Sequence, residues 1–371
     1  LTGADTEMDD GDARENTQVL TTDGTIAFGD VDLADGHTLS ITPSGTGYLG
    51  NLTASVSNSS QGDGSGEIAW TFQVSDGDLD YLSATDVLVQ TYTIEIDDGN
   101  GGTDTQTVTI TIQGTNDAPV ITAADTSGSV AELADGDPDE NTLELTAQGT
   151  IDFDDVDVND THTVSVSAIG SAPRGTLTAV VSGSEVTWTF SVIDGELDDL
   201  AEGDTVTQSY WVTIDDGNGG TDQQMVDITL TGTNDVAIIS GTTTGMVIEA
   251  DAIDTIGGLL DVVDPDVRQD GTVEAAFVAA VIMGTFGSLT IAADGAWSYT
   301  LDNSLDTTDA LVFGDDVTDS FTVSTIDGTT QVINVSVSGV GFDFEFDDFG
   351  GNSGSSDIKL LDACLLYTSP S

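Results

Sequence analysis

The feature that constrains this chain most is an internal repeat. The nonapeptide IDDGNGGTD occurs at Ile96–Asp104 and again at Ile214–Asp222, 118 positions apart. A second stretch, Thr25–Thr42, resembles Thr150–Ser167 at an offset of 125 positions. Self-similarity at a fixed period indicates that one structural unit is built several times along the chain. We therefore expect a tandem array of similar modules.

A third and more divergent copy begins near Gly241. We place the modules at residues 1–117, 118–235 and 236–341, and expect the chain to be a fragment of a longer protein. Residues 342–371 are interpreted as an acidic tail or the start of a different module. Within this tail, Cys364–Ser371 (CLLYTSPS) resembles a translated sequencing adapter, so we expect residues 364–371 to be foreign. Because Cys364 is the single cysteine, no disulfide can form within the chain.

Each copy has the alternating pattern of β-strands, with an aromatic pair on one strand face. The pairs are Trp70 with Phe72, Trp188 with Phe190, and Trp297 with Tyr299. Such a pair could line a sugar-binding platform, but its mid-strand position on a single face favours a core. The repeated Asn-Gly sequence supplies the positive φ angles of a hairpin turn, which is how we interpret the nonapeptide. Each copy holds about seven short strands and no helix signal, which predicts an all-β fold of tandem Greek-key sandwiches of the immunoglobulin type.

The chain is extremely acidic, with 67 acidic residues against four basic ones and a formal net charge of −63. Such a charge repels nucleic acid and anionic membranes but favours divalent cations as partners. No run of about 18 apolar residues predicts a membrane span.

Acidic residues recur at fixed positions of the module. Calcium takes six to eight oxygen ligands, so several short acidic loops would have to converge on one ion. Acids in loops can also simply be solvated, but their recurrence in two or three copies favours a shared role. The recurrent positions are Glu7 and Glu132; the Asp-x-Asp pairs Asp30 with Asp32, Asp155 with Asp157, and Asp264 with Asp266; Asp80, Glu196 and Asp198; Asp98, Asp216 and Asp327; and the Asn-Asp linkers Asn116–Asp117 and Asn234–Asp235.

The copies resemble VCBS repeats and related bacterial cadherin-like domains of large secreted adhesins of the RTX type. The stretch Ile96–Val120 (IDDGNGGTDTQTVTITIQGTNDAPV) is similar to the end of that repeat, and Gly287–Asn303 (GSLTIAADGAWSYTLDN) is similar to its central segment. The resemblance covers the chain to about Val340. It implies calcium-rigidified extracellular sandwiches, secreted by a type I route to the bacterial surface.

The resemblance also implies that calcium lies between consecutive modules. The first junction would use Glu7, Asp80, Asn116, Asp117, Asp155, Asp157 and Asp216. The second would use Glu132, Glu196, Asp198, Asn234, Asp235, Asp264, Asp266 and Asp327. Asp30, Asp32 and Asp98 hold the corresponding positions of the first copy. After the third copy the Thr-Asn-Asp linker is missing, which puts a third junction in doubt.

Enzymatic functions are poorly supported. The only histidines, His37 and His162, occupy one repeat position, and neither a Gly-x-Ser-x-Gly nor a His-Glu-x-x-His motif is present. The acids alone leave a glycosidase-type carboxylate pair open, but their repetition in consecutive copies favours binding over catalysis. We therefore predict a non-enzymatic spacer or stalk in a cell-surface adhesin. Its partners would be calcium ions, neighbouring repeats and, through other domains, a surface glycan or protein. The alternative is an accessory or carbohydrate-binding region of a secreted enzyme.

Overall fold

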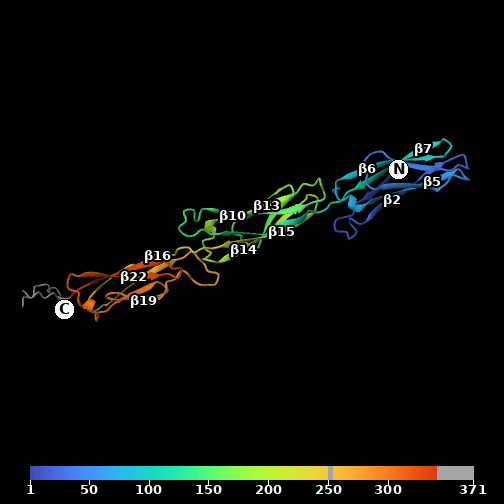
Figure 1. The fold of residues 1–371 in the computed structure, drawn as a ribbon. Coiled ribbons are helices and arrows are strands. Elements are labelled where there is room, and N and C mark those ends of the chain that lie inside the picture. Colours follow the sequence, from blue (N-terminus) through green and yellow to red (C-terminus); the bar gives the residue numbers. More distant parts are fainter. Residues whose placement is uncertain (250–253, 341–371) are drawn as a thin grey trace, which may run out of the picture. The chain divides into compact units, whose positions relative to one another are not determined.

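The computed structural model describes residues 1–249 and 254–340, so the tail at 342–371 and Cys364 lie outside the described residues. The chain forms two compact units. One consists of Leu1–Val236 with Asp264–Glu274, and the other consists of Ala237–Val263 with the chain from Ala275 onward. The first unit contains two β-sandwiches and the second contains one, and their strands are labelled in Figure 1.

The first sandwich is built from two sheets, with strand orders β1-β7-β6-β3 and β2-β5-β4. Strand β1 is parallel to β7, and the other pairs are antiparallel. Its elements are β1 (Thr2–Thr6), β2 (Val19–Gly29), β3 (Thr38–Pro43), β4 (Asn51–Asn58), β5 (Ser65–Ser75), the 3-10 turn η1 (Asp76–Asp78), β6 (Val87–Asp97) and β7 (Thr103–Gln113).

The second sandwich repeats this plan and adds one strand, β8, at a sheet edge. Its sheets have the orders β11-β14-β15-β9 and β12-β13-β10-β8. Its elements are β8 (Val120–Ala124), β9 (Ser127–Ala131), β10 (Glu144–Asp154), β11 (Thr163–Ile169), β12 (Thr176–Ser182), β13 (Glu185–Ile193), the 3-10 turn η2 (Asp194–Glu196), β14 (Thr205–Asp215) and β15 (Thr221–Thr231).

The third sandwich, in the second unit, has sheets of orders β17-β23-β22 and β16-β18-β21-β20-β19. Its elements are β16 (Ile238–Gly241), β17 (Thr244–Ile248), β18 (Thr255–Val263), β19 (Ala280–Met283), β20 (Gly287–Ile291), β21 (Ala296–Leu301), the helical turn α1 (Asp306–Asp309), β22 (Asp316–Ser324) and β23 (Thr330–Ser338). No sequence pattern predicted α1, which is a single turn inside a loop. No helix in the described ranges is long and apolar enough to cross a membrane.

Each sandwich has its own hydrophobic core, and the predicted aromatic strand lies at its centre. Trp188 and Phe190 are completely buried, so the aromatic pair is core rather than a sugar platform. The tryptophan lies opposite a glycine on the neighbouring strand, Gly149 in the second sandwich. A Cβ atom on Gly149 would come within 2.5 Å of the Trp188 ring, so glycine makes room for the indole. Gly24 and Gly258 face Trp70 and Trp297 in the same way.

The predicted fold class, tandem all-β sandwiches, is confirmed by these sheets. The nonapeptide is the hairpin turn between β6 and β7 and again between β14 and β15. Gly99 and Gly101 have the expected positive φ values of 76° and 107°. The module boundaries after residues 117 and 235 stay predictions.

Candidate metal centres

The linker Thr115–Ala118 is held from both sides by acidic side chains. The backbone N–H of Thr115 donates to the Glu7 carboxylate at 2.8 Å, and that of Asp117 donates to Oδ2 of Asp157 at 2.8 Å. The side-chain amide of Asn116 donates to Asp216 at 2.9 Å. The linker therefore joins Glu7 of the first sandwich to the Asp155–Asp157 loop of the second through direct hydrogen bonds.

Two groups of carboxylates flank this linker. One consists of Asp10, Glu15 and Asp117, and the other of Asp155, Asp160 and Asp216. In each group one oxygen from every member lies within 4.8 Å of the others. Asp155 is positioned by His162, whose Nε2 lies 2.8 Å from Oδ2 of Asp155, and by the backbone N–H of Asp157, which donates to Oδ1.

The electrostatics of this cluster disfavour its charged form. Burial, followed by the charge of Asp157, raises the pKa of Asp117 to about 7. Burial also raises the pKa of Glu7 to about 7, and Asp117 and Asp80 add repulsion. The pKa of Asp157 rises to about 6, again chiefly by burial. These groups are costly to keep ionised unless a cation accompanies them.

Asp216 behaves differently. Burial alone would raise its pKa, but hydrogen bonds from Asn116 and from the backbone of Asn218, Gly219 and Gly220 together lower it. The hairpin turn of the second nonapeptide therefore holds the ionised Asp216 carboxylate against the linker.

The second linker, Thr233–Val236, repeats the arrangement within the first unit. Thr233 donates its N–H to Glu132 at 2.8 Å, and Asp235 donates to Oδ2 of Asp266 at 3.0 Å. One oxygen each of Glu132, Asp198 and Asp235 lies within 4.8 Å of the others. Burial raises the pKa values of Glu132 and Asp235 to about 7 and that of Asp266 to about 6.

The loop at 264–274 adds a carboxylate that has no counterpart among the predicted residues. Asp264, Asp266 and Glu274 bring oxygens within 4.8 Å of one another. Glu274 is buried and also pairs with the guanidinium of Arg268. A cation at this group would therefore share Glu274 with an arginine, a feature that the first linker lacks.

Eight predicted carboxylates belong to none of the four groups found among the described residues: Glu7, Asp80, Asp157, Glu196, Asp327, Asp30, Asp32 and Asp98. Glu7 and Asp157 nevertheless hold the first linker through hydrogen bonds. Glu196 is exposed, and its carboxylate accepts from the N–H of Gly175 at 3.3 Å. Asp327 belongs to the second unit, where its carboxylate accepts from the N–H of Ala237 at 3.1 Å. Asp30, Asp32 and Asp98 lie in the first sandwich.

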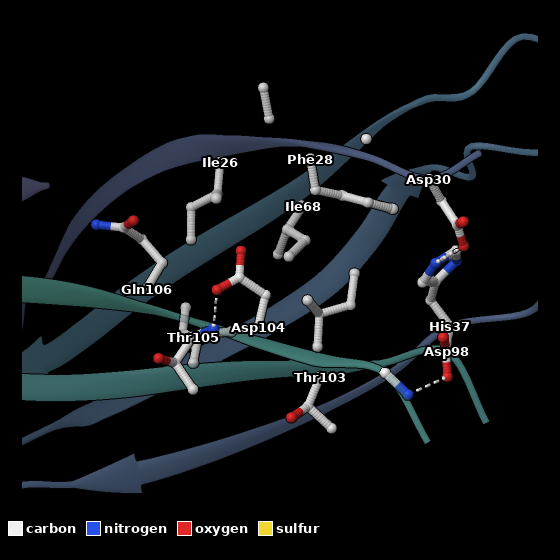
Figure 2. A pocket seen from close by; sticks show the side chains of 15 residues that line it. Ile26, Phe28, Asp30, His37, Ile68, Asp98, Thr103, Asp104, Thr105 and Gln106 are labelled. Carbon is white, nitrogen blue, oxygen red and sulfur yellow. Dashed lines mark hydrogen bonds and ion pairs between the residues drawn. The ribbon is translucent and has the colours of Figure 1, made fainter. Parts of the chain in front are cut away.

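Two of these acids, Asp30 and Asp98, lie near His37 (Figure 2). Asp30 is 3.0 Å from Nε2 of His37 and also accepts from the N–H of Asp32, while Asp98 accepts from the N–H of Gly102 at 2.9 Å. Among the residues that the structure describes, none of the three joins a group of carboxylates.

Sequence reasoning missed several acids, although the repeat carried a signal for some of them. Asp10 and Glu15 recur as Asp135 and Glu140 at the offset of 125. Asp160 repeats Asp35 of the first copy at the same offset. Glu274 has no such signal.

Asp76 and Asp194 were also missed. They are fully buried at the start of η1 and η2. Both oxygens of Asp194 accept backbone N–H groups, from Leu133 at 2.8 Å and from Asn141 at 2.9 Å. Asp76 does the same with Met8 and Asn16. We assign these two aspartates to loop anchoring.

The linker sites fit a hard cation such as Ca²⁺ by their donor set and by their unused oxygens. Several buried oxygens accept no hydrogen bond within the described ranges: Asn116 Oδ1, Asp157 Oδ1, Glu132 Oε1, Asp198 Oδ1, Asp235 Oδ2 and Asp266 Oδ1. A buried carboxylate oxygen without a donor is costly, and calcium binds carboxylate and amide oxygens.

No protein-family model matches the sequence, and no curated protein matches it. The chain is similar to solved extracellular cadherin domains at low identity. Protocadherin Gamma B7 extracellular cadherin domains 1–4 have 16% identity and a TM-score of 0.39, with 91% of this chain and 74% of that chain covered. Drosophila N-cadherin EC1-4 has 14% identity and a TM-score of 0.36, covering 91% and 73%. Mouse Cadherin-23 EC22-24 has 11% identity and a TM-score of 0.35, with 92% of this chain and 95% of that chain covered.

Proposed function

We propose that this chain is a calcium-rigidified extracellular spacer of a bacterial surface adhesin. The observation that carries the proposal is the linker Thr115–Ala118, where Asp157 accepts the Asp117 backbone N–H. There, buried oxygens of Asn116 and Asp157 accept no hydrogen bond from any residue that the structure describes. These acids come from two sandwiches and from the segment that joins them. An ion held there would fix the angle between the sandwiches.

Bound calcium would supply positive charge where the chain has concentrated negative charge. Glu7, Asp80 and Asp117 would hold it from the first sandwich and the linker, and Asp155, Asp157 and Asp216 from the second. The hydrogen bonds from Thr115 to Glu7 and from Asp117 to Asp157 already orient these carboxylates. Little ordering entropy is then left for the ion to overcome, which favours binding.

Spin labels test the proposed rigidity directly. Exposed positions Thr53 on β4 and Thr178 on β12 are changed to cysteine in a chain that also carries Cys364→Ser. The distance distribution between the labels should narrow in millimolar calcium and broaden in chelator. A matched pair within the second sandwich, Thr178 and Thr207, should give the same width in both conditions.

Calorimetric titration supplies the binding half of the test. The chain should take up calcium at both linkers, and Asp117→Ala should remove uptake at the first linker while leaving the second. The proposal would be contradicted if the Thr53–Thr178 distance distribution had the same width with and without calcium. It would also be contradicted if the chain took up no calcium.

A further inference from the structure

The loop at 264–274 lies between β18 and β19 in the sequence, yet it belongs to the compact unit that contains the second sandwich. The N–H of Val267 donates to the carbonyl of Asp199 at 3.1 Å. Gln269 donates its backbone N–H to Oδ2 of Asp204 at 2.8 Å, and its side-chain amide donates to the carbonyl of the first residue of β14 at 3.0 Å. Direct hydrogen bonds therefore fix this loop to the second sandwich.

The corresponding loop at the first linker is attached through a side chain. Residues 155–162 correspond to the start of the loop at 264–274, since both begin with the pattern Asp-x-Asp-Val. Asn159 donates its side-chain amide to Oδ2 of Asp86 at 3.1 Å. Asp86 is the counterpart of Asp204 at the offset of 118. Fixing a side chain costs conformational entropy that a backbone N–H of an ordered loop does not, so the second loop is held more firmly.

Asp199, which accepts a hydrogen bond from the loop, is itself held by a guanidinium. Arg174 donates to Oδ2 of Asp199 at 2.7 Å. It also donates to the carbonyl of Glu196 at 2.9 Å. The first copy has Leu49 and Tyr81 at the positions of this ion pair, so it cannot form the same support.

The carboxylates of the second loop also differ from those of the first linker. At the first linker, Asp160 and Asp216 form a group with Asp155. In the second loop, the neutral Gln269 occupies the position of Asp160. Asp327 is the counterpart of Asp216, but within the described ranges it does not join the corresponding group. Two of the three candidate ligands of the first group therefore have no equivalent in the second.

Glu274 and Arg268 take their place. Glu274 is 1% exposed, and its carboxylate brings an oxygen within 4.8 Å of those of Asp264 and Asp266. Its Oε1 accepts a hydrogen bond from Nε of Arg268, a position that Asn159 occupies in the first loop. A guanidinium supplies positive charge to a buried carboxylate without a bound ion, and it repels a calcium ion that enters the same group.

We propose that the loop at 264–274 is a brace that holds the second linker without calcium, with Arg268 in the place of one bound calcium ion. The inference rests on the calcium function proposed above and deepens it, because the two linkers then respond differently to calcium. Removing calcium leaves the carboxylates around Asp155 without their ion. The hydrogen bonds of Gln269 and the pairing of Arg268 need no ion, so they remain. The group around Asp235 still takes calcium, and the second linker therefore binds fewer ions than the first.

Counting the calcium bound to the full chain by equilibrium dialysis tests the role of Arg268. Arg268→Gln should add one bound calcium ion per chain, because Glu274 loses its guanidinium partner. Arg14→Gln is the matched control. It removes the same charge, but the exposed Arg14 pairs with Asp12, so the count should stay the same. An equal count in the Arg268→Gln variant and the unmodified chain would overturn the assignment of Arg268.

Amide hydrogen exchange in chelator tests the brace without any ion. The N–H groups of Val267 and Gln269 should exchange slowly, because both are hydrogen-bonded to the second sandwich. Asp204→Ala should speed the exchange of the Gln269 N–H by at least about tenfold, since its acceptor is lost. Glu202→Ala, a change of an exposed acid in the same connection, should leave it unchanged. Unchanged protection of β13 would show that the second sandwich stays folded.

The two proposals fail separately. If the Val267 and Gln269 N–H groups exchanged like free amides in chelator, the brace would depend on calcium and this inference would be wrong, while the calcium function would stand. If the unmodified chain took up no calcium, the calcium function and the assignment of Arg268 would both be wrong. Slow exchange in chelator would then still support the brace.

Discussion

Replacing Asp157 by asparagine should change the stability of the second sandwich in opposite directions with and without calcium. The side chain is 2% exposed, and burial together with Asp160, Asp155 and Asp216 raises its pKa to about 6. At neutral pH the folded protein must therefore carry an unfavourable charge at this position. Asparagine removes the charge, and its amide oxygen can still accept the N–H of Asp117.

The size of the effect follows from the raised pKa. The pKa of Asp157 is raised from 3.8 to about 6. Each unit of pKa shift corresponds to about 1.4 kcal/mol of free energy. Protons shared among neighbouring carboxylates and partial solvation reduce this to about 1–2 kcal/mol of stabilisation in chelator. A gain of about 1 kcal/mol raises the melting temperature of a domain near this size by about 4–8 °C.

Calcium reverses the sign because the variant has lost a buried ligand oxygen. An ion present at a hundredfold excess over its dissociation constant stabilises the native state by about 2.7 kcal/mol per site. In calcium, Asp157→Asn should therefore melt below the unmodified protein, and in chelator above it.

Calorimetric melts in millimolar calcium and in chelator measure both effects. Asp152→Asn is the matched control, since Asp152 is an exposed acid on β10, the strand that precedes the Asp157 loop, and should change little in either condition. If Asp157→Asn melted lower in both conditions, Asp157 would be a structural hydrogen-bond acceptor, and the reasoning would be refuted.

Three further predictions concern pH, the linker and the loop anchors. Without calcium, the free energy of unfolding should fall as pH rises from about 4 through about 7; the raised pKa values of Asp117 and Asp235, about 7 each, mean that the folded state binds more protons than the unfolded state there. Melts in chelator across this range check the sign, and saturating calcium should remove the fall. Calcium should also slow proteolytic cleavage within residues 114–119, and equal cleavage rates in calcium and chelator would place the ion elsewhere. Asp194→Ala should destabilise the second sandwich by about 2–4 kcal/mol with or without calcium, because two backbone N–H groups lose their acceptor; a loss that calcium abolished would make Asp194 a ligand.

The sequence by itself determined the strands, the turns and the repeat. These features depend on local periodicity: the alternation around Trp188 and Phe190 specifies a strand with one buried face, and Asn-Gly in the nonapeptide specifies a hairpin. Recurrence at fixed offsets also selected most of the acids that meet at the linkers, because equivalent positions of a repeated module have equivalent surroundings.

Only the tertiary structure decided which acids share a site and what each one does. Asp198 joins Glu132 and Asp235, while Glu196, two residues earlier, turns to Gly175. Asp194 resembles a ligand in sequence, yet both its oxygens are used by backbone N–H groups from another loop. Such roles depend on contacts between residues up to about a hundred positions apart, which local sequence patterns do not encode.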